Sequence, residues 1–321
     1  MCIRDRYVHN FMDRSVGIYD VDGLVNNGML SVPHLATIGT VASEALAPDV
    51  LNGKQLFYDS RDDRLAALDY MSCASCHNDG AEDGRVWDFT GVGEGLRNTI
   101  SLVGRAGVAH GNLHWSANFD EVQDFEAQIR SFSGGTGLMS NADFSAGTRS
   151  QPLGDPKAGV SADLDALAAY VASLDQIEAS PFRPIDRSLS PDAQAGAALF
   201  ISNGCNDCHE MPRMTDSDAV PTLHDVGTLQ ASSGDRLGGP LTGIDTPTLL
   251  GAWATGPYLH DGSQPTLQSA IAAHQGVTLT GAELDQLATF IRELESGADV
   301  LPSALRLASG EINGVGSDWQ T

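Results

Sequence analysis

Two copies of one pattern of sulfur and imidazole ligands occur in the chain, Cys73-Ala74-Ser75-Cys76-His77 and Cys205-Asn206-Asp207-Cys208-His209. Both have the form Cys-x-x-Cys-His, the attachment signature of a c-type haem. The two thiols add to the porphyrin as thioethers, and the adjoining histidine reaches the iron as the proximal axial ligand. A redox dithiol would need no histidine at this position, and zinc would need four ligands within one local module. The pattern therefore predicts two covalently bound haems c.

In this interpretation Cys73, Cys76 and His77 hold haem 1, and Cys205, Cys208 and His209 hold haem 2. The composition limits the other partners. The 321 residues suffice for two domains, and the net charge of −24 argues against nucleic acid and anionic membrane surfaces. The charge favours a cationic or metal-bearing partner, or reflects the general solubility of an exported protein. No stretch approaches the ~20 apolar residues of a membrane span.

The start of the chain conflicts with the haem motifs. Residues 1–6 are polar and charged and do not form a secretory signal. Covalent haem attachment takes place outside the cytoplasm, and the opening hexapeptide resembles a translated sequencing adapter. We therefore predict an N-terminally truncated fragment of a periplasmic or cell-surface protein, in which Cys2 has no role.

The segments that must position the two motifs form an internal repeat. Residues 48–57 match residues 191–200 at proline, aspartate, glycine, leucine and phenylalanine, and each segment leads into a haem motif. Proline near the start is typical of a helix N-terminus. Each half also closes on a second predicted helix, 162–174 and 282–294, the latter with a Thr-x-x-Glu capping box that starts at Thr280.

An opening helix, a haem motif and a closing helix are the parts of a cytochrome c fold. We predict a mainly α chain with two tandem cytochrome c-type domains, residues 47–180 for haem 1 and 185–296 for haem 2. The proline-containing stretch 179–184 cannot continue a helix and is the predicted linker. Residues 131–160, rich in glycine and serine, are a predicted loop, and residues 297–321 a flexible tail.

The first 46 residues do not have the pattern of a cytochrome. Short β-type runs at 7–11, 15–21 and 35–41 are separated by turns. They resemble the last blade of a surface-protein β-propeller, the remnant of an upstream domain. The alternative is an N-terminal arm packed on the haem domains.

Two further stretches, Asp245-Thr246-Pro247-Thr248-Leu249-Leu250 and Thr255-Gly256-Pro257-Tyr258-Leu259-His260-Asp261-Gly262-Ser263, carry a family resemblance. With the two haem motifs, residues 47–295 resemble the bacterial di-haem cytochrome c peroxidases and their relative that matures a tryptophan-derived quinone. The resemblance implies an oxidoreductase that passes electrons from haem 2 to haem 1, where peroxide or a substrate reacts. It implies hydrogen peroxide and a small electron-donor protein, a cytochrome c or cupredoxin, as partners.

The resemblance also assigns roles to individual residues. His274 falls where the peroxidases place the methionine ligand of haem 2, so bis-His ligation with His209 is expected, at a lower potential than His/Met. The alternative is a solvent-facing histidine at a helix end. Asn98 and the carbonyls of Thr255 and Pro257 match an oxygen-ligated calcium site between the haems.

Trp115 matches the tryptophan that relays electrons between the haems towards the catalytic iron on His77, with ordinary core packing as the alternative. Other positions depart from the family. The removable distal histidine of haem 1 would fall on Thr90, so that iron is expected to be open, or bound by His110 or His114.

The glutamate that assists O–O cleavage is expected near residues 133–139, which contain no carboxylate. Acid–base assistance would have to come from elsewhere. The nearby acids lie on an apparent helix where we expect solvent exposure: Glu121, Asp124 and Glu126. His224 and His260 are expected to be structural.

Two functions follow from these patterns. The first is a peroxidase-like oxidoreductase with an open haem 1, which the missing distal histidine favours. The second is an electron-transfer module with both irons six-coordinate, part of a larger surface protein. The missing glutamate and the spare histidines favour this second function.

Overall fold

The computed structural model describes residues 5–295, so the predicted tail lies outside the described residues. The chain divides into two compact units, residues 1–51 and 52–321. Among the described residues, no helix has the length and apolar content needed to cross a bilayer.

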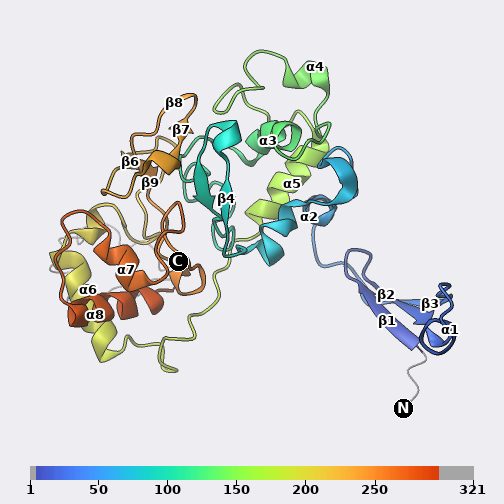
Figure 1. The fold of residues 1–321 in the computed structure, drawn as a ribbon, viewed down its shortest axis with the longest axis horizontal. Helices are drawn as coiled ribbons and strands as arrows, with labels where there is room; N and C mark the ends of the chain where they lie inside the picture. Colours follow the sequence, from blue (N-terminus) through green and yellow to red (C-terminus); the bar gives the residue numbers. More distant parts are fainter. Residues whose placement is uncertain (1–4, 296–321) are drawn as a thin grey trace, which may run out of the picture. The chain divides into compact units, whose positions relative to one another are not determined.

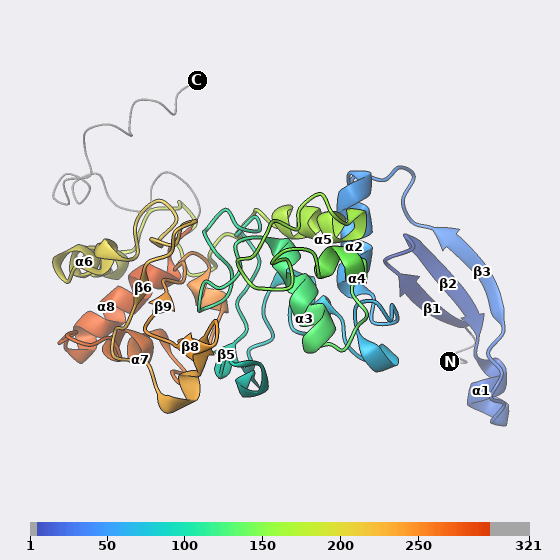
Figure 2. The ribbon, with the colours of Figure 1, turned by 90° about the horizontal axis from the view of Figure 1, so that it is seen from above.

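The first unit is a small antiparallel sheet. Its strands are β1 (Asp5–Asn10), β2 (Ser15–Asp20) and β3 (His34–Gly39), and they pair in the order β1-β2-β3 (Figure 2). Helix α1 (Asp22–Asn27) follows β2 and ends at Gly28, whose φ of 66° suits glycine. The three predicted β runs are therefore strands, and their assignment to a propeller blade stays a prediction.

The second unit is built mainly from helices joined by long irregular segments (Figure 1). Its α-helices are α2 (Pro48–Tyr58, which begins in the first unit), α3 (Phe125–Ser131), α4 (Asn141–Phe144), α5 (Ala162–Ala172), α6 (Pro191–Ser202), α7 (Leu267–Ala272) and α8 (Gly281–Arg292). Its strands form three two-stranded ladders: β4 (Val86–Asp88) with β5 (Leu96–Asn98), β6 (Leu223–His224) with β9 (Ile244–Asp245), and β7 (Asp235–Arg236) with β8 (Gly239–Pro240). Single 3-10 turns complete it: η1 (Ala67–Asp69), η2 (Cys73–Ser75), η3 (Asn78–Gly80), η4 (Thr90–Val92), η5 (Val122–Asp124), η6 (Cys205–Asp207), η7 (Ala231–Ser233) and η8 (Ala252–Ala254).

The internal repeat is a repeated helix–helix contact. A β-carbon on Gly53 of α2 would lie 1.8 Å from the carbonyl oxygen of Ala166 in α5. One on Gly196 of α6 would lie 2.1 Å from the carbonyl oxygen of Gln286 in α8. The glycine shared by the two copies thus lets each opening helix touch the backbone of its closing helix.

The shared phenylalanine packs beside this contact in both copies. Phe57 lies edge-on to Tyr170 at 5.1 Å between ring centroids, and Phe200 lies edge-on to Phe290 at 5.4 Å.

The predicted capping box is also present, because Thr280 Oγ1 accepts the N–H of Glu283 and the Glu283 carboxylate accepts the N–H of Thr280. The four helices that the repeat predicts are confirmed.

The glycine contact leads to a stability prediction. Gly196→Ala should lower the free energy of unfolding of the holoprotein by about 1–3 kcal/mol, because the added carbon forces α6 and α8 apart. Urea denaturation followed by circular dichroism measures this. Gly281→Ala is the matched control, since it has no neighbour within 4 Å and should be neutral or stabilising. Equal stabilities of the two variants would contradict the close contact.

Of the three acidic residues around α3, Asp124 and Glu126 are buried and Glu121 is partly buried, which corrects the expectation of solvent exposure. Asp124 is 1% exposed and accepts a hydrogen bond from the ammonium of Lys157, itself 1% exposed, at 2.5 Å. Glu121 accepts the backbone N–H groups of Lys157 and Ala158. These acids therefore hold the loop that precedes α5.

Glu126 is also buried, with 0% exposure, although it was expected to face solvent. Its carboxylate accepts Nε of Arg130 at 2.7 Å and the backbone N–H groups of Leu138 and Met139. It therefore fixes the segment where a catalytic glutamate was expected. None of these three acids lines the haem 1 cavity described below.

Candidate functional site

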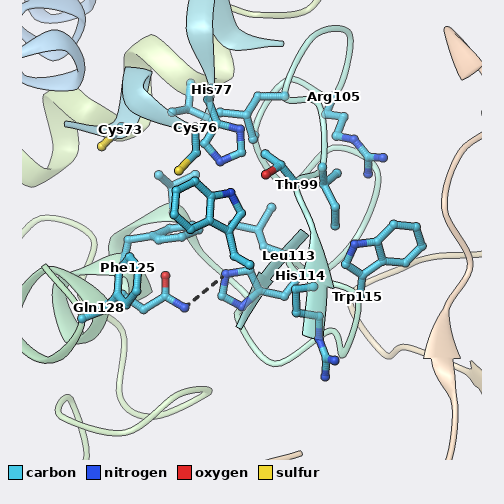
Figure 3. A pocket seen from close by; sticks show the side chains of 18 of the residues that line it. Cys73, Cys76, His77, Thr99, Arg105, Leu113, His114, Trp115, Phe125 and Gln128 are labelled. Atoms are coloured by element: carbon cyan, nitrogen blue, oxygen red, sulfur yellow. Dashed lines mark hydrogen bonds between the residues drawn. The ribbon is translucent and has the colours of Figure 1, made fainter. Parts of the chain in front are cut away.

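The first Cys-x-x-Cys-His motif lines a cavity of about 250 Å³. Its walls are mainly apolar, contributed by α2, α3, α5 and the segment between β5 and η5 (Figure 3). Cys73, Cys76 and His77 all face this space. Burial raises the pKa of the Cys73 and Cys76 thiols to about 11, so the pocket favours uncharged sulfur, as in a thioether.

The second motif lines a cavity of about 580 Å³ against α6, α7 and α8. Cys205, Cys208, His209 and His274 all contribute to its wall. His274, the predicted axial ligand, therefore lines the same cavity as the second motif. His274 Nδ1 lies 2.9 Å from the carbonyl oxygen of Ala270, one turn back in α7.

Both motif histidines have the orientation that iron ligation requires. Nδ1 of His77 lies 3.2 Å from the carbonyl oxygen of Ala81, and Nδ1 of His209 lies 3.2 Å from that of Met214. A carbonyl can only accept, so Nδ1 carries the proton and Nε2 keeps its lone pair. Burial, above all, lowers the pKa of both imidazoles, to about 4 for His209, which keeps them neutral. Both sites therefore fit a covalently attached haem with a proximal histidine.

The Cys208 thiol also lies near His224 and Asp216, a cluster with metal-ligand chemistry. His224 Nε2 is 2.7 Å from an Asp216 oxygen, and its Nδ1 is 3.9 Å from the sulfur. His224 is therefore paired with Asp216, and its structural role stays a prediction. His260 is buried and bonds Ser233 Oγ at 2.7 Å.

Trp115 lines both cavities. Its indole N–H donates to the carbonyl of Asn98 at 2.8 Å, and its own carbonyl accepts the N–H of Asp245 at 2.9 Å. Asn98 belongs to the first half of the unit and Asp245 to the second. The tryptophan is therefore fixed from both sides in the wall between the two motifs.

Two of the three predicted calcium ligands, Asn98 and Pro257, are in contact near this tryptophan. Asn98 Nδ2 lies 2.5 Å from the carbonyl oxygen of Pro257, and its Oδ1 is buried without a hydrogen-bond partner. Asn98, Thr255 and Pro257 all line the second cavity. A hard cation such as calcium would satisfy this buried amide oxygen of Asn98, which has no hydrogen-bond partner.

Two histidines besides His77 line cavity 1. His110 and His114 both line it, whereas Thr90 does not. In Figure 3, His77 and His114 point into the same space from opposite sides. Burial is the main cause of the lowered pKa of His77 and of His209, and the nearby His114 and His274, respectively, lower each pKa further.

Comparisons with known proteins agree with this geometry. A family model described as "RoxA-like, cytochrome c-like" matches residues 243–277. The methylamine utilization protein MauG of Methylorubrum extorquens is 29% identical over 277 residues, which cover 75% of this chain and 71% of MauG. A solved structure of a variant of the di-haem peroxidase BthA from Burkholderia thailandensis superposes with a TM-score of 0.53 at 18% identity, covering 80% of this chain and 89% of that one.

The chain is similar to the di-haem cytochrome c peroxidases and the MauG-like proteins in sequence and in fold. It is thus a peroxidase-like oxidoreductase with two covalently bound haems c, and its fold is that of the di-haem peroxidases. Hydrazine synthase subunit gamma of Kuenenia stuttgartiensis is also similar, 28% identical over 244 residues. That alignment spans 62% of this chain and 63% of the subunit.

In this di-haem cytochrome, the matched segment 243–277 ends just beyond His274 and contains Thr255 and Pro257. The residues that sequence reasoning missed lie around His114. Asn118 and Glu94 form buried hydrogen bonds behind it, and Gln128 reaches its other ring nitrogen. No motif links these residues, because they come from three separate segments.

Proposed function

We propose that the chain accepts electrons at the His209–His274 site and reduces hydrogen peroxide at the His77 site. When bound, the haems supply one-electron redox chemistry and an iron that can activate peroxide. The observation that carries the proposal is the shared wall of the two cavities, in which Trp115 is held by hydrogen bonds from both halves. The indole offers the protein's own electron path between the sites.

The proposal includes a finer organisation of the chain. Residues 47–180 and 185–296 would be tandem cytochrome c domains, in support of which each contains one glycine-mediated helix pair and one motif. Residues 1–46 would be the remnant of an upstream propeller. The location would be periplasmic or at the cell surface. The electron donor would be a small cytochrome c or cupredoxin whose basic surface complements the net charge of −24.

A calcium ion between the haems would be held by Asn98 Oδ1 and the carbonyls of Thr255 and Pro257. The contact of Asn98 with Pro257 supports this arrangement. Bound there, the ion would join β5 of the first half to the segment that follows η8.

His274→Ala tests the electron-entry site. We expect the low-spin ferric signal of haem 2 to become high-spin, because the variant removes the imidazole that faces His209, and we expect its reduction potential to rise. Electron paramagnetic resonance of the oxidised protein and potentiometric titration measure these changes. His224→Ala, in the same cavity but bonded to Asp216, is the control. An unchanged haem 2 signal in His274→Ala would refute the ligand.

The same spectra test the function. One high-spin and one low-spin ferric signal, with hydrogen peroxide changing the high-spin one, is the expected result for a peroxidase. Two low-spin signals that respond neither to peroxide nor, after reduction, to carbon monoxide would instead establish the electron-transfer module.

A further inference from the structure

His114 is held in one orientation on the side of cavity 1 opposite His77. Its backbone φ is +68°, in the left-handed region that a residue with a β-carbon adopts only when its surroundings impose it. Its ring packs against Phe119 at 4.4 Å and edge-on against Phe125 at 5.2 Å between centroids. The imidazole therefore cannot swing freely within the cavity.

A buried hydrogen-bond chain fixes the protonation of this imidazole. The Glu94 carboxylate accepts hydrogen bonds from Arg97 Nη2 at 3.1 Å, from Ser116 Oγ at 3.0 Å and from the Asn118 amide. Because a carboxylate only accepts, the Asn118 nitrogen must face Glu94, and its oxygen must face His114. That oxygen lies 2.7 Å from His114 Nδ1. Nδ1 is therefore protonated, and Nε2 carries the lone pair.

The contact of the other ring nitrogen, Nε2, assigns the same tautomer to His114 independently. Gln128 Nε2, a donor, lies 3.5 Å from His114 Nε2, so the latter acts as the acceptor. Burial, above all, lowers the pKa of His114, which keeps the ring neutral and able to take a proton. Its surroundings differ from those of His274, whose Nδ1 bonds only the carbonyl of its own helix.

We propose that His114 is the proton acceptor and donor for peroxide at haem 1, with Asn118 and Glu94 as positioning residues and Gln128 as a second polar contact. This inference rests on the proposed peroxidase function and supplies the acid–base group that residues 133–139 lack. A neutral histidine with Nδ1 anchored as a donor and Nε2 left as an acceptor is suited to both proton transfers.

The proton movements balance. Hydrogen peroxide gives one proton to His114 Nε2, and His114 returns it to the distal oxygen as the O–O bond breaks. That oxygen leaves as water. Two electrons from the external donor and two protons from solvent convert the remaining oxygen to a second water.

Four measurements on the holoprotein test the assignment of His114. His114→Ala should slow the reaction with hydrogen peroxide by about 10²-fold or more. It should slow cyanide binding to the ferric protein similarly, because hydrogen cyanide must lose its proton to bind. The ferric spin state of haem 1 should stay high-spin. Added imidazole should restore part of both rates. Asn118→Ala, which frees the ring to change tautomer, should slow both reactions to a smaller extent.

His110→Ala is the competing variant, since His110 lines the same cavity but has no contact with this hydrogen-bond chain in the described structure. A loss of rate in His110→Ala and not in His114→Ala would overturn the assignment. Conversion of a low-spin haem 1 to high-spin in His114→Ala would make His114 an axial ligand and also overturn it. A wild-type protein inert to peroxide would remove the proposed function itself, whereas a reactive wild type with an equally reactive His114→Ala would remove this inference alone.

Discussion

Replacing Cys205 and Cys208 together by serine is expected to leave the chain with one covalent haem in place of two. The serine hydroxyls cannot form the thioethers, while His209 and His274 still face the cavity. A haem held by these histidines alone can be extracted with acidic acetone. The pyridine haemochrome content and the intact mass of the purified protein measure the change.

The matched control is Cys73→Ser with Cys76→Ser, which should remove the other haem and give the same total. The two variants should differ in their spectra after extraction, because only the first loses the covalent attachment of the haem for which we predict His209/His274 ligation. We also expect a lower thermal midpoint for the Cys205/Cys208 variant, since the haem that fills the cavity of about 580 Å³ is no longer covalently attached and can dissociate. Two covalent haems remaining in either variant would contradict the assignment of the motifs.

Local patterns predicted the parts of the fold that depend on local physics. The two pentapeptides, the helices around Gly53 and Gly196, and the capping box at Thr280 are each encoded within a few consecutive residues. The strands at the start of the chain followed from the same kind of pattern. The place of His274 in the second cavity came from family resemblance, because one histidine at a helix end has no distinctive spacing.

The hydrogen-bond chain behind His114 could not be predicted, for a physical reason. His114 and Asn118 are close in sequence, but Glu94 comes from the turn before β5 and Gln128 from α3. The segments between them are irregular, and turns such as that at His114 use backbone conformations that propensity does not reveal. A buried carboxylate with three donors has no signature in one sequence.

The expectation of exposed acids around α3 was wrong for a related reason. Short acidic segments usually face solvent, and the cation that permits burial of Asp124 lies 33 positions later, in a loop. Lys157 lies in residues 131–160, the stretch rich in glycine and serine that was predicted to be a loop. The pairing thus depends on a long-range contact that residue spacing does not encode.

That contact gives the last prediction. Lys157→Ala should destabilise the holoprotein by about 3–5 kcal/mol at pH 7, because it leaves Asp124 charged, buried and unpaired. Asp124 and Lys157 are each about 1% exposed, so water cannot replace the lost partner without opening the loop. Urea denaturation of holoprotein, monitored by circular dichroism, gives the free energy of unfolding.

The loss should depend on pH in a defined direction. Burial already raises the pKa of Asp124, and Lys157 opposes that shift. Without the lysine, the folded-state pKa rises further above that of the unfolded chain, so the folded state binds more protons between these two values. Stability of the variant relative to wild type should therefore fall as the pH rises through this window and recover as the pH is lowered.

The double variant Lys157→Met with Asp124→Leu removes both charges and should regain most of the stability at pH 7. If the free energy of unfolding of Lys157→Ala lies within about 1 kcal/mol of the wild-type value, the buried pair does not hold the loop, since surface substitutions stay within that range.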